Sequence, residues 1–556
     1  MKEGFRQSMA WLHTWTGLIA GWILFLVFLT GTAGYFDEEI TRWMQPERPL
    51  AAQHTVDVAV GLATSQERLT AQAASAHRWI VWLPSLRDDP NWRIHWPGLL
   101  ENVKYGLGQQ YIDPVTGDAL SPRAHVKPRN TGGGVALYRL HYNLHYLPER
   151  AGVLIVGLST MLMLLAISSG VMTHKKIFVD FFTFRPAKGQ RSWLDAHNLI
   201  SVTALPFFVM ITYSGLVFFM DVYMPAAMYE VYGRTSYVAG RSTPLNPRSN
   251  AQFDPMYEVS PEWQPPARGY GQAMPLIDLR HPLSQVQALW GTSRIAAVLV
   301  EHPGQAGARI TFIRTEDSLL GGGRLTFDGV SGQLLQLPPR QRSTPWNAQD
   351  VLINLHEGLF AGWGLRWLYF LSGLLGCAMI ATGLVLWTVK RRVKQDKRLK
   401  AGQSVEFGFR LVEALNIGTI AGLCTAVAVY FWANRLLPTD FAGRRAWELH
   451  CLFIAWGALL LYAAVRLRFA PSLRVWQEQL WIAAAAYALI PLLNWATTDR
   501  HLGVTVPHGD WALAGFDLTV LALGICFAAG ALKVGRRRHV GVHTGVVQAE
   551  PRKAPA

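Results

Sequence analysis

Long apolar runs constrain this chain more than any other feature of its sequence. Eight stretches carry few charges and are long enough to cross the roughly 30 Å hydrocarbon core of a bilayer; they are residues 11–36, 151–173, 198–222, 367–389, 411–432, 446–465, 477–495 and 511–533. In agreement, 50% of the residues are hydrophobic and only 16% are charged. The sequence therefore predicts an α-helical integral membrane protein with about eight transmembrane helices. The first run is longer than the apolar part of a signal peptide, so we interpret it as an uncleaved anchor within residues 1–36.

Lysine and arginine are concentrated after the second, fourth and eighth apolar runs, at residues 175–191, 390–400 and 536–538. Short basic loops stay on the cytoplasmic side of a membrane. We therefore expect both termini, including the tail 536–556, to be cytoplasmic, and the long loops 37–140 and 223–350 to be periplasmic in an inner-membrane protein of a Gram-negative cell. The net charge of +15 then reflects topology and contact with membrane lipid, and we expect no nucleic-acid partner.

An internal duplication organises the first 400 residues. Asn-Leu-His occurs at residues 143–145 and again at 354–356, each time just before an apolar run. In four apolar segments a histidine is followed, 18 to 27 residues later, by the glycine of a Thr-Gly or Ser-Gly pair; the pairs are His13 with Gly31, His197 with Gly215, His145 with Gly170, and His356 with Gly383. Two copies of one helical arrangement are therefore predicted.

The two long loops repeat one another as well. YIDPVTGDAL at residues 111–120 resembles LTFDGVSGQLL at residues 325–335. Each predicts two strands joined by a tight turn whose glycine can adopt a positive φ. Each copy of the core is thus expected to be a helix, a small α/β periplasmic domain and a second helix, with residues 141–222 and 351–400 as the helical parts and 401–535 as four further helices.

The histidines near the ends of these helices fall at two depths, given a rise of about 1.5 Å per residue. His13, His174 and His197 lie at the cytoplasmic side, and His141, His145 and His356 lie at the outer side. An imidazole inside a membrane is costly without a partner, and a neutral imidazole can bind haem iron through one ring nitrogen. Two clusters on four helices therefore predict two b-type haems at two depths.

The repeat selects among these histidines. His145 and His356, from the repeated Asn-Leu-His, are the predicted ligands of the outer haem iron, and His13 and His197 are those of the inner one. Taken singly, each histidine could instead form an ordinary hydrogen bond at the level of the lipid headgroups.

Two histidines have open roles. His174 could replace an inner ligand, or it could bind a haem propionate beside Lys175 and Lys176. His141 lies one helical turn from His145, and it could be an alternative ligand or a surface residue. The sequence does not identify catalytic residues.

Four segments resemble the motif blocks of the PepSY-associated transmembrane helix family, and the third is the longest; they are WLHTWTGLIAGWILFLVFLTG (11–31), LHYNLHYLPERAG (140–152), THKKIFVDFFTFRPAKGQRSWLDAHN (173–198) and NLHEGLFAGWGLRW (354–367). The resemblance covers about residues 5–400. It implies a four-helix core with two b haems and two periplasmic PepSY-like domains. Five residues match the histidines of the family motifs: His13, His145, His174, His197 and His356. The family includes membrane reductases of ferric siderophores.

We therefore expect an oxidoreductase that reduces ferric siderophore in the periplasm. Hard oxygen ligands hold Fe(III) more tightly than Fe(II), so reduction releases the metal. No dinucleotide-binding motif opens a strand-turn-helix unit, so the electron donor is either a cytoplasmic flavoprotein or membrane quinol. A tyrosine- and arginine-rich stretch, 223–241, could dock the chelate or form an interfacial belt.

Two functions of other classes remain open. One is a non-enzymatic regulator whose PepSY-like domains bind a peptidase or a peptide. The other is a permease for the siderophore or the freed iron, with residues 401–535 as the conduit.

Overall fold

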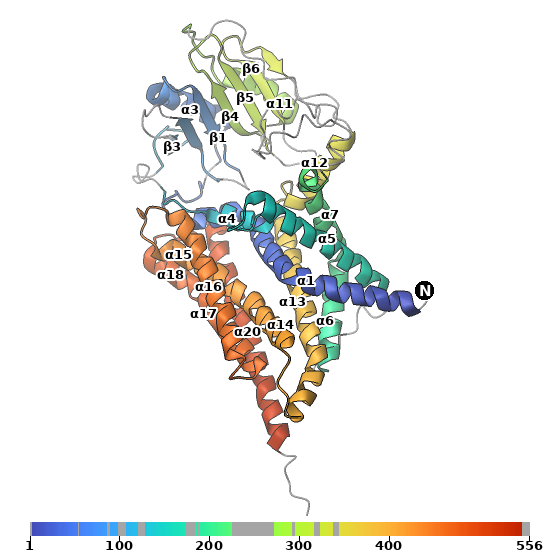
Figure 1. Ribbon diagram of the computed structural model, residues 1–556. Coiled ribbons are helices and arrows are strands. Elements are labelled where there is room, and N and C mark those ends of the chain that lie inside the picture. Colours follow the sequence, from blue (N-terminus) through green and yellow to red (C-terminus); the bar gives the residue numbers. More distant parts are fainter. Residues whose placement is uncertain are drawn as a thin grey trace, which may run out of the picture. The chain divides into compact units, whose positions relative to one another are not determined.

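The computed structural model of this chain describes residues 3–53, 55–85, 89–97, 107–120, 128–173, 184–186, 188–224, 272–291, 295–315, 323–336 and 344–546. These residues form two compact units. The first contains Met1–Pro46, Arg129–Tyr213 and Trp367–Ala556, and the second contains Glu47–Pro128 and Ser214–Arg366. Figure 1 shows the helices of the first unit and the strands of the second.

Long apolar helices make up the first unit. Its N-terminal part is built on α1 (Glu3–Gly34), α4 (Gly133–Tyr142), α5 (Glu149–Thr173), α6 (Gln190–Thr203), the first part of α7 (Leu205–Phe218) and most of α13 (Trp363–Lys400). Among the described residues, seven helices are long and apolar enough to cross a membrane, or eight if one bent pair counts as a single span. The prediction of a multi-pass helical protein with about eight spans is thus confirmed in this respect.

The third predicted span differs from a straight helix over 198–222. It consists of α6 and α7, which are bent by 68° relative to one another. Pro206 is the second residue of α7, and it has no N–H to continue the hydrogen-bond ladder of α6. The backbone N–H of Ala204 still bonds to the carbonyl of Ile200, and the new helix begins directly afterwards. Proline therefore accounts for the bend.

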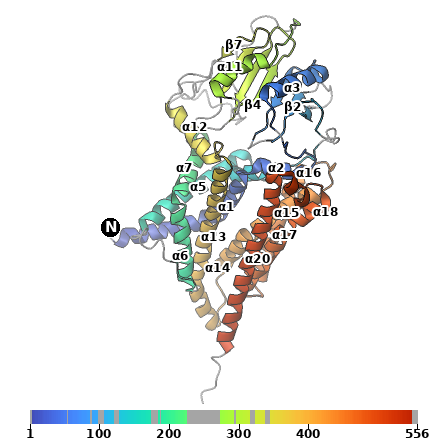
Figure 2. The same cartoon turned by 180° about the vertical axis from the view of Figure 1, so that it is seen from behind.

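The C-terminal helices pack on one another in the same unit. They are α14 (Phe407–Ile420), α15 (Gly422–Leu436), α16 (Arg444–Arg466), α17 (Ser472–Ala488), α18 (Ile490–Thr497), α19 (Leu502–His508) and α20 (Trp511–Val546). Figure 2 shows α17 and α20 side by side, in agreement with their extensive packing. As at α7, a proline at the start of α18 separates it from α17.

Short helix α2 (Asp37–Met44) is held against these C-terminal helices by buried polar groups. Arg42 forms a salt bridge of 2.7 Å with Asp510. The indole N–H of Trp43 donates to Asp517 over 2.9 Å, and the guanidinium of Arg435 lies 3.7 Å from the centre of the Trp43 ring. Charges buried among helices need such partners, so this network fixes the segment that follows α1.

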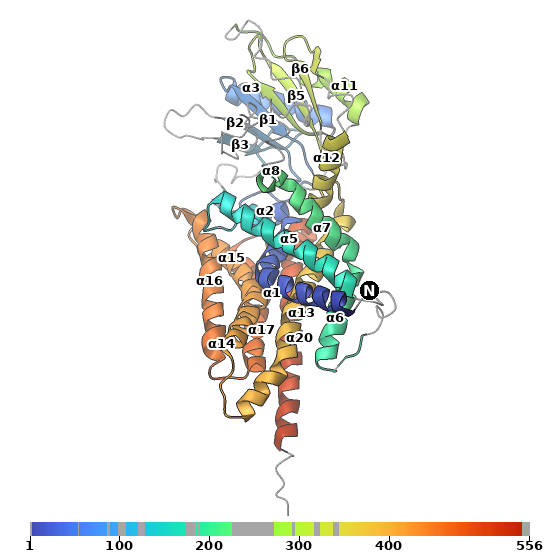
Figure 3. The same ribbon diagram turned by 45° about the vertical axis from the view of Figure 1, so that its right-hand side comes forward.

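The second unit contains one antiparallel sheet of seven strands in the order β3-β2-β1-β4-β5-β6-β7. The strands are β1 (Arg78–Trp82), β2 (Arg93–Pro97), β3 (Leu107–Tyr111), β4 (Ile295–Glu301), β5 (Arg309–Arg314), β6 (Arg324–Asp328) and β7 (Leu334–Gln336). Helix α3 (Val58–Ala73) precedes the first three strands, and α11 (Arg280–Trp290) precedes the last four. Both helices pack on the sheet (Figure 3), and their apolar residues share one core with it.

The two predicted periplasmic domains are therefore joined into a single sheet. Strands β1 and β4, one from each copy, pair in antiparallel register, with Trp79 opposite Val300 and Val81 opposite Val298. Pairing removes one exposed edge from each copy, and an exposed edge is a site of unwanted association.

The predicted tight turns are confirmed in both copies. Asp113 follows β3 and Asp328 ends β6, and each carboxylate accepts hydrogen bonds from two backbone N–H groups in its turn. Gly117 and Gly332 complete the turns with φ of +77° and +74°. Equivalent capping at both sites supports the duplication inferred from the sequence.

Candidate functional site

His13 projects from α1 onto the neighbouring helix α5. Its Nδ1 lies 2.8 Å from the carbonyl oxygen of Ala166. Because a carbonyl oxygen can only accept, Nδ1 carries the proton, and Nε2 of the neutral ring carries the lone pair. The imidazole lies against Gly170, where a Cβ atom would be 3.0 Å from its Cε1 atom.

His197 has an equivalent environment in the second copy. It projects from α6, and its Nδ1 lies 3.0 Å from the carbonyl oxygen of Met379 and 3.2 Å from the hydroxyl of Thr382, both in α13. A Cβ atom on Gly383 would be 3.2 Å from the His197 ring. Both inner histidines are therefore oriented by Nδ1 and lie against a glycine of another helix.

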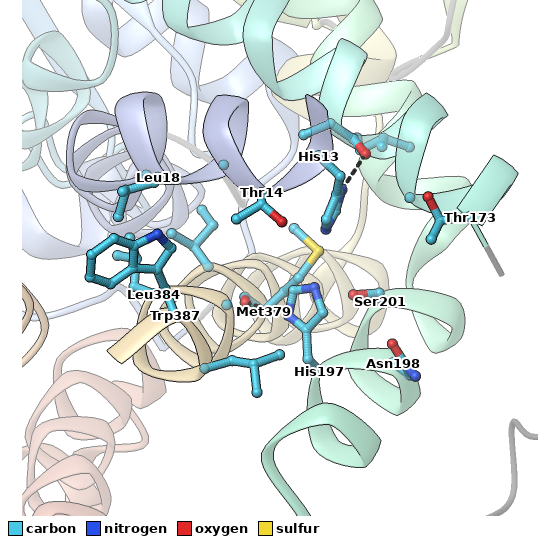
Figure 4. A pocket seen from close by; sticks show the side chains of 18 of the residues that line it. His13, Thr14, Leu18, Thr173, His197, Asn198, Ser201, Met379, Leu384 and Trp387 are labelled. Carbon is cyan, nitrogen blue, oxygen red and sulfur yellow. Dashed lines mark hydrogen bonds between the residues drawn. The ribbon is translucent and has the colours of Figure 1, made fainter. Parts of the chain in front are cut away.

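The rings of His13 and His197 point toward one another across a single cavity (Figure 4). Their centroids are 6.1 Å apart. The cavity has a volume of about 440 Å³, which is within the range of roughly 300–1,000 Å³ found for cofactor sites. Its walls come from α1, α5, α6, α7 and α13, and they are mainly apolar. Three basic residues also line it: Arg6, Lys390 and Arg391.

This arrangement fits the ligand set of a haem. Two metal–nitrogen bonds of about 2 Å each, together with the half-widths of two imidazole rings, span a distance close to the one observed between the centroids. A histidine that binds a metal usually donates its other ring N–H to a carbonyl or a carboxylate, as His13 and His197 do. The apolar walls suit a macrocycle, and the basic side chains suit its carboxylates.

Part of the long third motif serves to position His197. Asp195, two residues before it, accepts two hydrogen bonds of 2.9 Å from the guanidinium of Arg185. Ser192 donates to the carbonyl of Arg185 and accepts from the backbone N–H of Lys188. The segment that leads into α6 is therefore tied to the first turns of that helix. His174, Lys175 and Lys176 lie outside the described residues, as do most residues of the tyrosine-rich stretch.

His141 has the same type of environment as His13. It belongs to α4, and its Nδ1 lies 2.8 Å from the carbonyl oxygen of Val27 in α1. A Cβ atom on Gly31 would be only 2.5 Å from this ring. Burial lowers the pKa of His141, although the bond to Val27 opposes this effect. The imidazole is therefore kept in the neutral form that a metal ligand requires.

His356 is the corresponding residue of the second unit. It lies in the last turn of α12 (Thr344–Glu357), and its Nδ1 is 2.9 Å from the hydroxyl of Ser214. A Cβ atom on Gly215 would be 3.0 Å from its ring, and the ring of Phe218 packs edge-on at 5.3 Å.

His145 has a different environment, in the connection between α4 and α5. Its ring stacks on Phe453 at 5.6 Å and lies 5.9 Å from the ring of His450, both in α16. The adjacent Tyr146 is 60% exposed, and its hydroxyl lies 2.8 Å from Nδ1 of His450. Partial burial and the nearby His450 lower the pKa of His145. The predicted pairing of His145 with His356 joins two different units and stays a prediction.

Comparison with known proteins agrees with the sequence motifs. Residues 10–390 match the PepSY-associated TM region. This chain belongs to that family. An uncharacterized protein of Pseudomonas aeruginosa is 26% identical to it over 408 residues, which cover 70% of this chain and 91% of the relative. The protein is therefore a multi-pass membrane protein of the PepSY-associated family.

The family match ends before α14 and includes five of the histidines: His13, His141, His145, His197 and His356. Sequence reasoning did not find the contact of each ring with a glycine of another helix, because it paired each histidine with the glycine of its own segment. It also missed His450, which no repeated motif surrounds. The Thr-Gly and Ser-Gly pairs were the available signal, but their partners depend on helix packing.

Proposed function

We propose that this PepSY-family protein is an inner-membrane haem b oxidoreductase that reduces ferric siderophore in the periplasm. One observation carries the proposal: His13 and His197, from equivalent positions of two sequence repeats, face one another across one cavity at a distance suited to two ligands of one metal ion. Bound haem would supply reversible one-electron chemistry at its iron.

The residues around the cavity hold and orient the cofactor. The carbonyl oxygens of Ala166 and Met379 accept from Nδ1 of the two histidines, which leaves Nε2 as the ring nitrogen that would bind the iron. Both carbonyls belong to long helices, so the ring positions are set by rigid elements. The mainly apolar walls would provide a surface of low polarity for the porphyrin ring.

The ring contacts of His141 and His356 make them our candidate ligands of a second haem, in place of the pair that the repeated Asn-Leu-His predicts. Each has Nδ1 beside an oxygen atom of another helix and a ring against a glycine, as the inner pair has. His145 shares neither feature. We therefore replace His145 by His141 in the proposed ligand set and keep His13, His197 and His356.

Reduction of a ferric chelate suits a periplasmic reductase because one electron weakens the bonds between iron and hard oxygen donors without changing the chelator. The electron would come from membrane quinol or from a cytoplasmic flavoprotein. The duplicated PepSY-like sheet is the part of the chain that we expect to meet the chelate.

The proposal is tested on the purified full-length protein in detergent. We expect low-spin b-type absorption bands after dithionite reduction, a pyridine haemochrome count of two per chain, and reoxidation when a ferric hydroxamate or ferric catecholate is added under argon. If neither ferric chelate reoxidises the reduced haem, the protein is not a siderophore reductase. A colourless protein would instead favour the PepSY-type regulator, because the histidines would then have a structural role alone.

A further inference from the structure

Four glycines of the membrane core contact the imidazole of a histidine that comes from a different helix. In each copy of the repeat, the N-terminal and C-terminal segments each place one histidine against a glycine of the other segment. The contacts are His13 on Gly170 and His141 on Gly31 in the first copy, and His197 on Gly383 and His356 on Gly215 in the second. A histidine therefore does not contact the glycine that follows it in its own segment; His13, for example, contacts Gly170 and not Gly31. Each segment supplies a ring to one neighbour and accepts a ring from a neighbour.

The helix geometry explains why glycine occupies these positions. In three of the contacts the histidine bonds to the carbonyl four residues before the glycine: Ala166 before Gly170, Val27 before Gly31 and Met379 before Gly383. This carbonyl is the one that accepts the helical N–H of the glycine itself, and its second lone pair remains available. A side chain in a helix covers the turn on its N-terminal side, so a residue larger than glycine would cover this oxygen.

The short distances between each glycine and its histidine ring support this reasoning. A Cβ atom would come within 2.5 Å of the histidine ring at Gly31, 3.0 Å at Gly170 and Gly215, and 3.2 Å at Gly383. Real Cβ contacts are rarely so short, because non-bonded heavy atoms repel one another well inside their optimal separation of about 3.5–4.0 Å. The ring would therefore have to tilt or move away, and its bond to the oxygen atom would lengthen.

We propose that Gly31, Gly170, Gly215 and Gly383 are positioning residues for the axial histidines. Each of these glycines leaves room for one imidazole ring and lies near an oxygen atom that bonds to Nδ1 of that ring. The room and the bond together set the orientation and the depth of that imidazole. This inference rests on the proposed haem function and specifies which backbone positions tune each haem. Gly170 and Gly383 act on the inner haem, and Gly31 and Gly215 act on the outer haem.

The test replaces each glycine by alanine in the full-length protein and measures haem content, the low-temperature EPR spectrum of the ferric haems, and both midpoint potentials. The EPR signal of a low-spin haem depends on the orientation of its two imidazole planes, so it reports ring position without any turnover. We expect Gly170→Ala to shift the signal and the midpoint of one haem while those of the other stay unchanged. Gly31→Ala should shift the other haem, and its smaller space predicts the larger effect.

Matched controls separate this effect from a general change in helix propensity. Gly457 in α16 and Gly515 in α20 are helical glycines whose added Cβ atoms would have no neighbour within 4 Å. Gly457→Ala and Gly515→Ala should leave both haems as they are in the wild type. If Gly170→Ala does not accumulate, Gly383→Ala, which has the mildest contact, decides the question for the inner haem.

The outcomes distinguish this inference from the function on which it rests. A wild-type protein without haem would overturn both. Two haems in the wild type, with unchanged EPR signals and midpoints in Gly170→Ala and Gly383→Ala, would overturn the positioning role alone. Equal shifts in the Gly457→Ala control would overturn it as well.

Discussion

Replacing His141 separates two readings of the outer haem site, because the sequence alone favours His145 as the ligand and the structure favours His141. The change His141→Ala removes a buried imidazole and its bond to the Val27 carbonyl. That carbonyl keeps its helical bond within α1, so the lost hydrogen bond costs only about 1 kcal/mol. The emptied volume adds about 2 kcal/mol.

A total of about 3 kcal/mol is smaller than the 5–15 kcal/mol by which typical domains are stable. We therefore expect His141→Ala to fold and to lose one of its two haems. His145→Ala should keep both, because its ring lies on Phe453 and bonds to no helix carbonyl among the described contacts.

The measurement is a pyridine haemochrome count together with a redox titration of each variant. The haem that we propose between His13 and His197 would serve as an internal control for folding, because its midpoint should not change in either variant. Two haems in His141→Ala and one in His145→Ala would refute the structural reasoning and restore the ligand that the repeated Asn-Leu-His suggests.

The remaining predictions concern stability. Arg42→Leu alone should destabilise the protein by about 3–5 kcal/mol, because it removes the salt bridge from the buried Asp510 carboxylate. Thermal unfolding should show that adding Asp510→Leu restores stability. An Arg42→Leu variant as stable as wild type would contradict this prediction. Asn416→Ala removes one bond to α1 and one to α13 and should cost about 1–3 kcal/mol without loss of haem. The pKa of His145 is lowered from 6.5 by partial burial and by His450, so its contribution to stability is present above about pH 6.5 and is lost as the pH falls below it. The melting temperature of His145→Phe should therefore fall less than that of wild type between pH 7 and pH 5, and parallel curves would argue against this.

Features set by local sequence could be predicted well. The apolar runs gave seven or eight helices, and the turns at Asp113 and Asp328 were identified because an aspartate and a glycine at fixed spacing determine a turn locally. The bend between α6 and α7 also has a local cause, Pro206, although an apolar run alone does not reveal it. The sequence also singled out His13 and His197, whose rings lie 6.1 Å apart; their role as haem ligands stays a prediction.

Features that depend on long-range packing were missed. The pairing of β1 with β4 joins residues more than 200 positions apart, and nothing in either strand specifies which edge it meets. The place of each Asn-Leu-His relative to its helix could not be predicted either: the second copy lies inside the last turn of α12, whereas the first follows the end of α4. The two identical tripeptides therefore occupy different positions relative to the ends of their helices. His141, like His356, lies in the last turn of a helix. The choice between His145 and His141 as a ligand stays a prediction.

This difference shows what the duplication preserves. The Asn-Leu-His tripeptide occupies a different position relative to the helix end in each copy. Each copy nevertheless places two imidazoles against two glycines of neighbouring helices. A ring can meet such a glycine only if both helices keep their relative rotation and depth, so the four contacts constrain helix packing more tightly than any single motif does. If the histidines had only structural roles, one buried hydrogen bond per ring would satisfy them at many positions. Each of the four rings instead combines an oxygen partner at Nδ1 with a glycine of another helix. A metal ligand is commonly oriented through its other ring nitrogen, and for this reason the shared geometry supports the haem proposal more strongly than the number of histidines does.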